Sequence, residues 1–254
     1  MNTHLAIISL IEGITEFLPI SSTAHLILFS KFSGIDLTDA YIKFYLLFIQ
    51  FGALLAGVIL FSKKIFTNKD MFTNIVISFI PSAVFGFIFY KLFKQLLEGN
   101  IQLLVLMLIL GGVIFIYLEK VFVKKVIERD VMTKQDALLV GLAQAIAIIP
   151  GVSRSGATII AGMFRGIKKA VIVEYTFILA LPTLGAAVVY DAYKNREMLA
   201  TITSYQELFF GFVIAFIVAF ITLSLLKKYL PRISLTAFGW YRIILGVFVL
   251  MWYI

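Results

Sequence analysis

A cluster of ionisable and hydroxyl side chains lies near the start of the chain, in a segment that is otherwise apolar. Its members are Glu12, Glu16, Ser21, Ser22, Thr23 and His25. On a helix, Glu12 and Glu16 would share one face, where two negative charges repel each other unless something compensates them. This spacing predicts that the pair binds a divalent cation, shares a proton, or acts as a general base and the residue that orients it. His25 lies within reach of that face, so we expect it to take part in the same chemistry.

A second polar cluster interrupts another apolar segment near the middle of the chain. It reads Pro150-Gly151-Val152-Ser153-Arg154-Ser155-Gly156-Ala157-Thr158. The two glycines permit close backbone approach, and Ser153 can cap the helix that follows. Free N–H groups at a helix start bind anions, and the guanidinium of Arg154 matches phosphate oxygens bidentately. With Ser155 and Thr158 as further hydroxyl donors, this cluster predicts an anion-binding site.

The composition around these clusters is that of a polytopic membrane protein. Of the 254 residues, 61% are hydrophobic and 14% are charged, and the mean hydropathy is +1.03, whereas a soluble domain has about 25% charged residues. The chain has no cysteine and only two histidines, which excludes disulfides, thiolate metal sites and His-rich metal centres. The net charge of +8 is expected to reflect membrane topology rather than a nucleic-acid partner.

Six segments are long and apolar enough to cross a bilayer as helices, which takes about 20 residues each. They are Tyr41–Phe61, Phe72–Tyr90, Ile101–Leu118, Val171–Tyr190, Leu208–Leu226 and Leu235–Ile254. Two shorter apolar segments, Leu5–Pro19 and Ala137–Pro150, each end at a proline beside a polar cluster. Because broken backbone at membrane depth must be buried in protein or line a wet cavity, each is expected to begin a re-entrant helical hairpin. The expected fold is all-α, one membrane domain over residues 1–254 with six transmembrane helices and two such hairpins.

An internal repeat relates the two halves of the chain. A shift of 132 residues places Glu12 on Gln144, Ser21 on Ser153, Ser22 on Arg154 and Thr23 on Ser155. Each half has one hairpin followed by three spans, and because three is odd, the second half must enter the membrane inverted. The repeats are expected at about residues 1–120 and 133–254. Their polar clusters should meet near the midplane, where inverted-repeat membrane proteins place substrate sites.

The distribution of positive charge predicts the orientation in the membrane. If the N-terminus lies outside, the inside segments are 62–71, 119–136, 164–170 and 227–234, and they hold fourteen Lys and Arg against six in the outside segments. Because Lys and Arg accumulate in cytoplasmic loops, both termini are expected outside.

The two clusters together suit phosphoryl transfer from a phosphate carried by a lipid. Donors in the second cluster would neutralise the phosphate oxygens, and an activated nucleophile from the first would attack in line. Ser22 and His25 are both candidate nucleophiles, direct attack by water is a third route, and the sequence does not decide among them. The alternative function is a transporter or flippase of polyprenyl phosphate or another anion, because opposed polar loops are also found in transporters. The glutamate pair favours the enzyme, since it would repel an anionic cargo.

Both clusters resemble the signature motifs of a known family. Glu12-Gly-Ile-Thr-Glu16-Phe-Leu-Pro-Ile-Ser-Ser-Thr-Ala-His25 and the segment 150–158 are similar to the motifs of the bacitracin-resistance type undecaprenyl-diphosphate phosphatases, and the resemblance covers the whole chain. It implies an integral enzyme of the bacterial plasma membrane. The implied reaction is hydrolysis of undecaprenyl diphosphate to undecaprenyl phosphate and inorganic phosphate, which recycles the lipid carrier for peptidoglycan and other cell-wall polymers.

The resemblance also implies roles for individual residues. The catalytic set, in a site facing the outer side, would be Glu12, Glu16, Ser22, His25 and Arg154. The diphosphate would be held by Ser21, Thr23, Gly151, Ser153, Ser155, Gly156 and Thr158. A divalent cation such as Mg²⁺ or Ca²⁺, held by Glu12 and Glu16, would assist, and no organic cofactor is expected. Ala24 stands where this family usually has glycine, which is a mild change at a helix start.

The expected partners are the polyprenyl diphosphate substrate and the lipid bilayer, with no nucleic acid. A homodimer is also expected to be sterically open to the chain, because small residues permit close helix packing. These residues are Gly111, Gly112, Gly185, Ala186 and Ala187.

Overall fold

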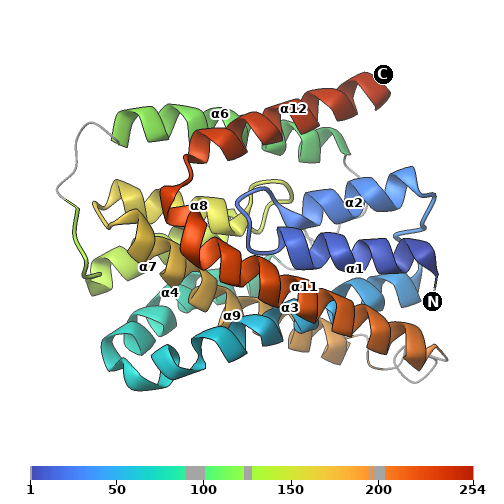
Figure 1. The fold of residues 1–254 in the computed structure, drawn as a ribbon, viewed down its shortest axis with the longest axis horizontal. Helices are drawn as coiled ribbons and strands as arrows, with labels where there is room; N and C mark the ends of the chain where they lie inside the picture. The colour runs from blue at the N-terminus through green and yellow to red at the C-terminus, as the bar shows by residue number, and fades with distance from the viewer. Residues whose placement is uncertain (1, 90–100, 123–127, 195, 197–203, 254) are drawn as a thin grey trace.

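The computed structural model describes residues 2–89, 101–122, 128–194, 196 and 204–253, and these are helical almost throughout, with no β-strand among them (Figure 1). The helices are α1 (Thr3–Thr15), α2 (Ser22–Phe32), α3 (Ala40–Thr67), α4 (Lys69–Ile88), α6 (Ile101–Phe122), α7 (Lys134–Ile146), α8 (Arg154–Phe164), α9 (Lys169–Lys194), α11 (Tyr205–Tyr229) and α12 (Leu235–Tyr253), with a short 3₁₀ turn, η1 (Leu230–Arg232), between the last two.

Six of these helices, namely α3, α4, α6, α9, α11 and α12, are long and apolar enough to cross a membrane. In a bilayer every backbone polar group must be paired within the protein, and a helix does this within one segment. Large apolar side chains such as Phe72, Phe87 and Trp252 are more than half exposed, as expected for surfaces that contact lipid. The prediction of an all-α, six-span, multi-pass membrane protein is confirmed. Tyr90 and Ile254, the predicted ends of two spans, lie outside the described residues.

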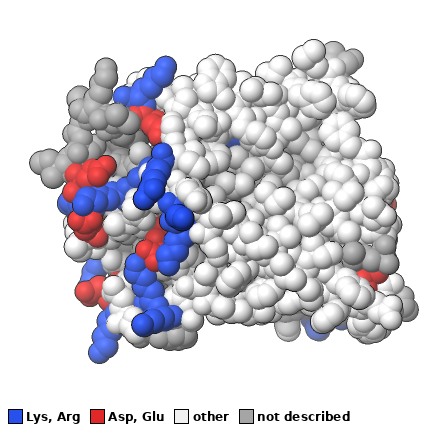
Figure 2. All heavy atoms as spheres, viewed as in Figure 1, with Lys and Arg blue, Asp and Glu red and all other residues white. Residues whose placement is uncertain are grey.

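Lys and Arg side chains gather at one end of the molecule, and much of the rest of the face in Figure 2 carries no charge. Hydrogen bonds connect the segments that lie at this end. Lys64 pairs with Glu174 of α9 at 2.6 Å, and the N–H of Arg129 donates to the carbonyl of Gly166 at 2.8 Å. In Figure 1 both chain termini lie toward the opposite end.

Two pairs of short helices, α1–α2 and α7–α8, lie among the long helices. In each pair the first helix has 13 residues and the second has 11. Helix α1 packs against α11 and α7 against α4, while α8 also contacts α6 and α9. The loops that join the two pairs face each other in the middle of the molecule (Figure 1), and this is where both polar clusters lie.

Two glycines that were expected to permit a dimer pack within the chain instead. A Cβ atom on Gly111 would lie 2.1 Å from Nη2 of Arg242, and one on Gly112 would lie 2.6 Å from the carbonyl oxygen of Gly239. These glycines therefore allow α6 to approach α12 closely. The homodimer itself remains a prediction.

The buried carboxylate of Asp136 holds the start of α7 at the basic end. It accepts hydrogen bonds from the N–H of Thr133 at 2.9 Å, from Nη2 of Arg129 at 3.1 Å and from Nε of Arg165 at 2.8 Å. Burial raises the pKa of Asp136, but the hydrogen bonds from Thr133 and Arg165 and the charge of Arg129 outweigh it and lower the pKa to about 2. Asp136 thus joins the α6–α7 connection, the start of α7 and the end of α8.

Asp136→Asn is expected to destabilise the protein by about 2 kcal/mol at neutral pH, because it weakens two bonds to arginine around a buried acceptor. The folded-state pKa lies below the ordinary value of 3.8. The contribution is therefore complete above about pH 4 and is lost as the pH falls toward 2. Thermal unfolding in detergent should show a gap between wild type and variant at pH 7 that closes on acidification. A gap independent of pH would contradict this reading, and Asp70→Asn, at an exposed acid of α4, is the control.

Candidate functional site

The two loops of the site end in the same unusual backbone conformation. Ser21 has φ of 72° and Ser153 has φ of 75°, and no other non-glycine residue in the described ranges has positive φ. Each serine caps the helix that follows: Oγ of Ser21 accepts from the N–H of Ala24 at 3.4 Å, and Oγ of Ser153 from that of Gly156 at 3.3 Å. Positive φ is unfavourable for a residue with a side chain and is concentrated at functional sites. In both loops it starts the next helix abruptly at the following residue, which is Ser22 in one loop and Arg154 in the other.

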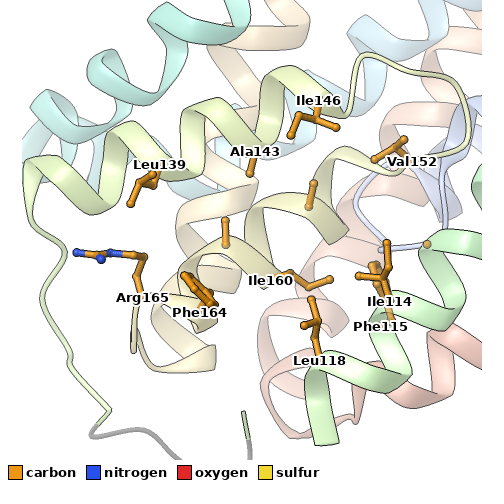
Figure 3. A pocket seen from close by; sticks show the side chains of 13 residues that line it. Ile114, Phe115, Leu118, Leu139, Ala143, Ile146, Val152, Ile160, Phe164 and Arg165 are labelled. Carbon is orange, nitrogen blue, oxygen red and sulfur yellow. The ribbon is translucent and has the colours of Figure 1, made fainter. Parts of the chain in front are cut away.

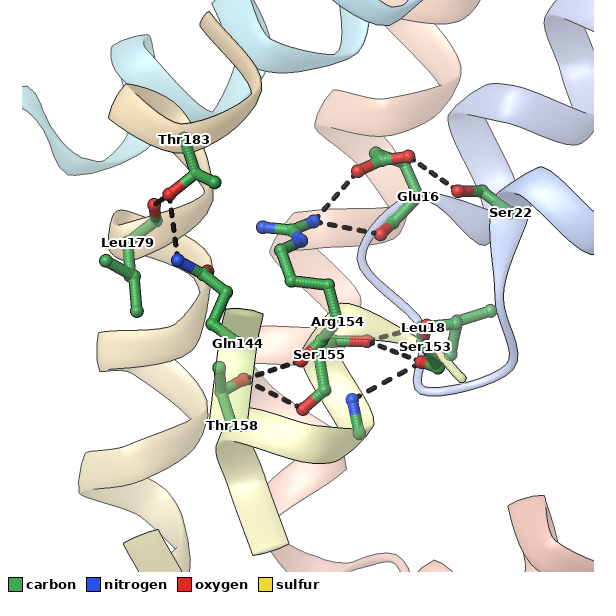
Figure 4. Close-up of polar contacts among 11 residues, drawn as sticks. Glu16, Leu18, Ser22, Gln144, Ser153, Arg154, Ser155, Thr158, Leu179 and Thr183 are labelled. Carbon is green, nitrogen blue, oxygen red and sulfur yellow. Dashed lines mark hydrogen bonds and ion pairs between the residues drawn. The ribbon is translucent and has the colours of Figure 1, made fainter. Parts of the chain in front are cut away.

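Glu16 lies at the centre of the contacts between the two loops (Figure 4). Its Oε2 accepts a hydrogen bond from Oγ of Ser22 at 2.7 Å, and its Oε1 pairs with Nη2 of Arg154 at 2.8 Å. The same Nη2 donates to the backbone carbonyl of Glu16 at 3.3 Å. The side chains of Glu16 and Arg154 are 4% and 12% exposed. The structure thus brings a carboxylate, a hydroxyl and a guanidinium, all predicted site residues, into one buried cluster.

Glu12 is fully buried, and neither of its carboxylate oxygens has a hydrogen-bond partner. Nη1 of Arg154 is also buried without a partner. A buried carboxylate is costly unless positive charge or donors compensate it, so these groups fit a cation beside Glu12 and Glu16. Within the described part of the chain, no three His, Asp or Glu side chains gather in a group that could hold a metal ion. The remaining ligands of such a cation would therefore be water or oxygens of the substrate.

The hydroxyl groups of the second loop contact the protein itself. Oγ of Ser155 donates to the carbonyl of Leu18 at 2.9 Å and so joins the two loops. Oγ1 of Thr158 donates to the carbonyl of Arg154 at 2.9 Å and accepts from Thr176 of α9 at 3.0 Å. Contacts from Ser155 and Thr158 to a diphosphate remain predictions.

The two glycines of this loop pack against α6. A Cβ atom on Gly151, which has φ of +91°, would lie 2.8 Å from the carbonyl oxygen of Leu104, and one on Gly156 would lie 2.2 Å from the ring of Phe115. Both positions therefore need glycine for packing. Their predicted contact with the diphosphate is untested.

The ring of His25 is engaged with two neighbours. Its Nδ1 lies 2.8 Å from the carbonyl oxygen of Ser21, and its Nε2 lies 2.7 Å from the hydroxyl of Tyr241 on α12. A carbonyl can only accept, so Nδ1 carries a hydrogen, and in the neutral ring Nε2 accepts from Tyr241. The structure therefore holds His25 through groups other than Ser22 and Glu16. Thr23 lies partly exposed in the first turn of α2.

The sequence analysis assigned no role to Tyr241 and Arg242, two adjacent residues of α12 that contact the site loops. Arg242 is fully buried, donating to the carbonyls of Gly151 at 2.7 Å and Val152 at 3.0 Å. It also donates to the carbonyl of Met107 in α6 at 3.0 Å. An arginine within an apolar span is costly and marks a functional position, so the sequence held this signal.

An apolar cavity of about 480 Å³ lies between α6, α7 and α8 (Figure 3). Its lining includes Ile114, Ile146, Val152 and Ile160, with Arg165 at its edge. Val152 belongs to the same loop as Ser153. The phosphate-binding side chains and a hydrocarbon-lined space thus adjoin the same loop.

A buried carboxylate, hydroxyl and guanidinium among six membrane helices define a multi-pass membrane protein with a site suited to phosphoryl transfer. The family model described as "Bacitracin resistance protein BacA" matches residues 5–248, and the chain belongs to this family.

Curated relatives match almost the whole chain. A protein of Sulfurihydrogenibium sp. (strain YO3AOP1) is 41% identical over 250 residues, which cover 97% of both chains. One from Persephonella marina is 42% identical and covers 96% of both chains, and one from Wolinella succinogenes is 40% identical over 98% of this chain and 97% of its own. Each of the three is named undecaprenyl-diphosphatase.

Arg242→Met is expected to lower the stability of the protein by about 2–4 kcal/mol, because it leaves carbonyls of the buried loop without a donor. The measurement is thermal unfolding of purified protein in detergent. Arg232→Met, at an exposed arginine of η1, is the matched control. Equal unfolding temperatures for the two variants would show that Arg242 does not hold the loop.

Proposed function

We propose that this protein hydrolyses undecaprenyl diphosphate to undecaprenyl phosphate and inorganic phosphate. The observation that carries the proposal is the buried contact of Glu16 with both Ser22 and Arg154, because it joins an activated hydroxyl to a phosphate-binding group. The relatives named undecaprenyl-diphosphatase support this substrate. The apolar cavity beside Val152 offers hydrocarbon surface next to the phosphate site, as a lipid substrate needs.

In this mechanism Ser22 is the nucleophile. Glu16 accepts the proton of its hydroxyl, and the Ser22 oxygen attacks the terminal phosphorus of the diphosphate. The bond from this phosphorus to the bridging oxygen breaks, and undecaprenyl phosphate leaves with the electron pair. Arg154 neutralises the non-bridging oxygens through its free Nη1. Water then releases inorganic phosphate from Ser22. The geometry favours Ser22 over His25, since both ring nitrogens of His25 are already bonded.

Glu12 and Glu16 would hold a divalent cation such as Mg²⁺ or Ca²⁺, and the unpaired carboxylate of Glu12 supports this assignment. Such a cation supplies positive charge for the diphosphate oxygens. In its absence, nearby negative charge on the two glutamates would oppose the approach of the substrate.

Three features support two inverted repeats, at about residues 1–120 and 133–254. The strained serines Ser21 and Ser153 are 132 residues apart. The packing of α1 on α11 is matched by that of α7 on α4, which the same shift would produce. Each short helix pair would then be a re-entrant hairpin, entering the membrane from opposite sides.

Two tyrosines provide the third feature. The hydroxyl of Tyr45 on α3 donates to the carbonyl of Leu5 at 3.0 Å. In the second half, Tyr175 on α9 contacts Ser78 at 2.6 Å, and Ser78 donates to the carbonyl of Ala137 at 2.6 Å. Leu5 and Ala137 are 132 residues apart, so equivalent carbonyls are bound from equivalent helices.

The proposed orientation places the basic end of the molecule in the cytoplasm and both termini outside, with the site open to the outer side of a bacterial plasma membrane. The clustering of Lys and Arg at one end supports it (Figure 2), because cytoplasmic segments are enriched in these residues. The transporter alternative is not favoured, since the relatives are named as diphosphatases and Glu12 would repel an anionic cargo.

The purified protein in detergent is expected to release inorganic phosphate from undecaprenyl diphosphate, with a large loss of rate when a chelator removes divalent cations. Arg154→Ala should reduce the rate at least about 100-fold, because it removes a charge aimed at the transition state. Arg232→Ala, at an exposed arginine, should keep the wild-type rate. No phosphate release by the wild type would refute the function, whereas an active Arg154→Ala variant would refute only the role of the arginine.

A phosphoenzyme trapped by rapid quenching is expected to be stable in acid, as a phosphoserine is, and to be absent from Ser22→Ala. The physical reason is that Oγ of Ser22 is the hydroxyl held against Glu16. A label that is lost in acid would instead indicate phosphohistidine at His25. The absence of any label under conditions of rapid turnover would indicate direct attack by water.

A further inference from the structure

Gln144, in the last turn of α7, has an amide whose orientation is set by its neighbours. The hydroxyl of Ser82 donates to the carbonyl of Gly141 at 3.3 Å, and that of Thr183 donates to the carbonyl of Leu179 at 2.9 Å. Both hydroxyl hydrogens are used in this way, so each oxygen can only accept from the amide. Nε2 of Gln144 donates to Ser82 at 2.8 Å and to Thr183 at 3.0 Å. The two hydroxyls therefore turn Oε1 of Gln144 away from themselves.

This Oε1 atom is buried without a partner, and Gln144 is 2% exposed. In the described chain, five buried side-chain polar atoms lack a partner, and four of them belong to Glu12, Gln144 and Arg154. Gln144 and Arg154 lie on two helices packed against each other. Figure 4 shows the amide of Gln144 on the side of the guanidinium that faces away from Glu16. Unsatisfied polar groups are rare in protein interiors, so their concentration here points to a ligand.

The chemistry of these atoms limits what the ligand is. The oxygens of Glu12 and Gln144 are acceptors, whereas Nη1 of Arg154 is a donor. A phosphate oxygen would satisfy only Arg154, and a metal ion would satisfy only the acceptors. Water both donates and accepts, and it is the second substrate of a hydrolase.

We propose that Gln144 is a catalytic residue that holds the attacking water through its unpaired Oε1 atom. This rests on the proposed function. The water oxygen forms a bond to phosphorus while the bond from phosphorus to Oγ of Ser22 breaks, and Oγ keeps the electron pair. One water proton passes to the carboxylate of Glu12, and Glu16 returns its proton to Ser22. The other hydrogen stays bonded to Gln144 and fixes the direction of attack.

The test compares Gln144→Met, which keeps the length of the side chain but removes the acceptor, with Gln144→Glu, which keeps an acceptor oxygen. The control is Gln135→Met, at an exposed glutamine of the same helix. Phosphate release from undecaprenyl diphosphate is measured for each purified protein in detergent, together with thermal unfolding. We expect Gln144→Met to lose about 100-fold in kcat with KM within about threefold of wild type. Gln144→Glu should retain more activity than Gln144→Met, and the control should match the wild type.

The outcomes separate this proposal from the function it rests on. An inactive wild-type protein would overturn both. An active wild type with kcat of Gln144→Met within about threefold of it would overturn only the role of Gln144. A rise in KM that accounts for the lost activity, or a fall in unfolding temperature that accounts for it, would assign Gln144 to substrate binding or to structure and would also overturn the proposal.

Discussion

The pairing of Glu16 with Arg154 is the interaction on which this site depends. Among membrane helices an isolated charge is costly, so each of these residues needs the other to remain charged while it is buried. The two belong to different halves of the chain, and their contact joins loops that are 138 residues apart. Ser155 strengthens the same junction by donating to the carbonyl of Leu18. The site therefore exists only when both helix pairs are in place.

The surrounding helices supply what these loops lack. Backbone that leaves a helix within an apolar protein loses its hydrogen bonds, and something must replace them. For the second loop the replacement is Arg242, whose guanidinium binds the carbonyls of Gly151 and Val152. Glycine at positions 151 and 156 allows α6 to lie close beside this loop. Each polar group that is not satisfied in this way belongs, with the exception of Ser30 Oγ, to Glu12, Gln144 or Arg154 within the described residues.

Sequence alone predicted the number of spans and the two polar clusters well, because both rest on local signals. A span is a run of apolar residues, and a polar cluster within such a run stands out. The pairing of Ser22, Glu16 and Arg154 in one place could be inferred only in outline, through the internal repeat. The roles of Tyr241 and Arg242 could not be inferred, because each depends on which loop lies opposite α12. The hydroxyls of Ser155 and Thr158 show the same limit: their types suit phosphate, but their partners here are backbone carbonyls.

Helix α12 touches both halves of the site through two successive residues. Tyr241 contacts His25 in the first half, and Arg242 contacts the loop of the second. Because these residues are neighbours on one rigid helix, they cannot be displaced independently. The outer surface of the same helix carries large apolar groups such as Trp240 and Phe248, each more than half exposed. A change in the lipids that press on α12 is therefore transmitted to both loops at once, which makes this helix a mechanical link between the bilayer and the geometry of catalysis.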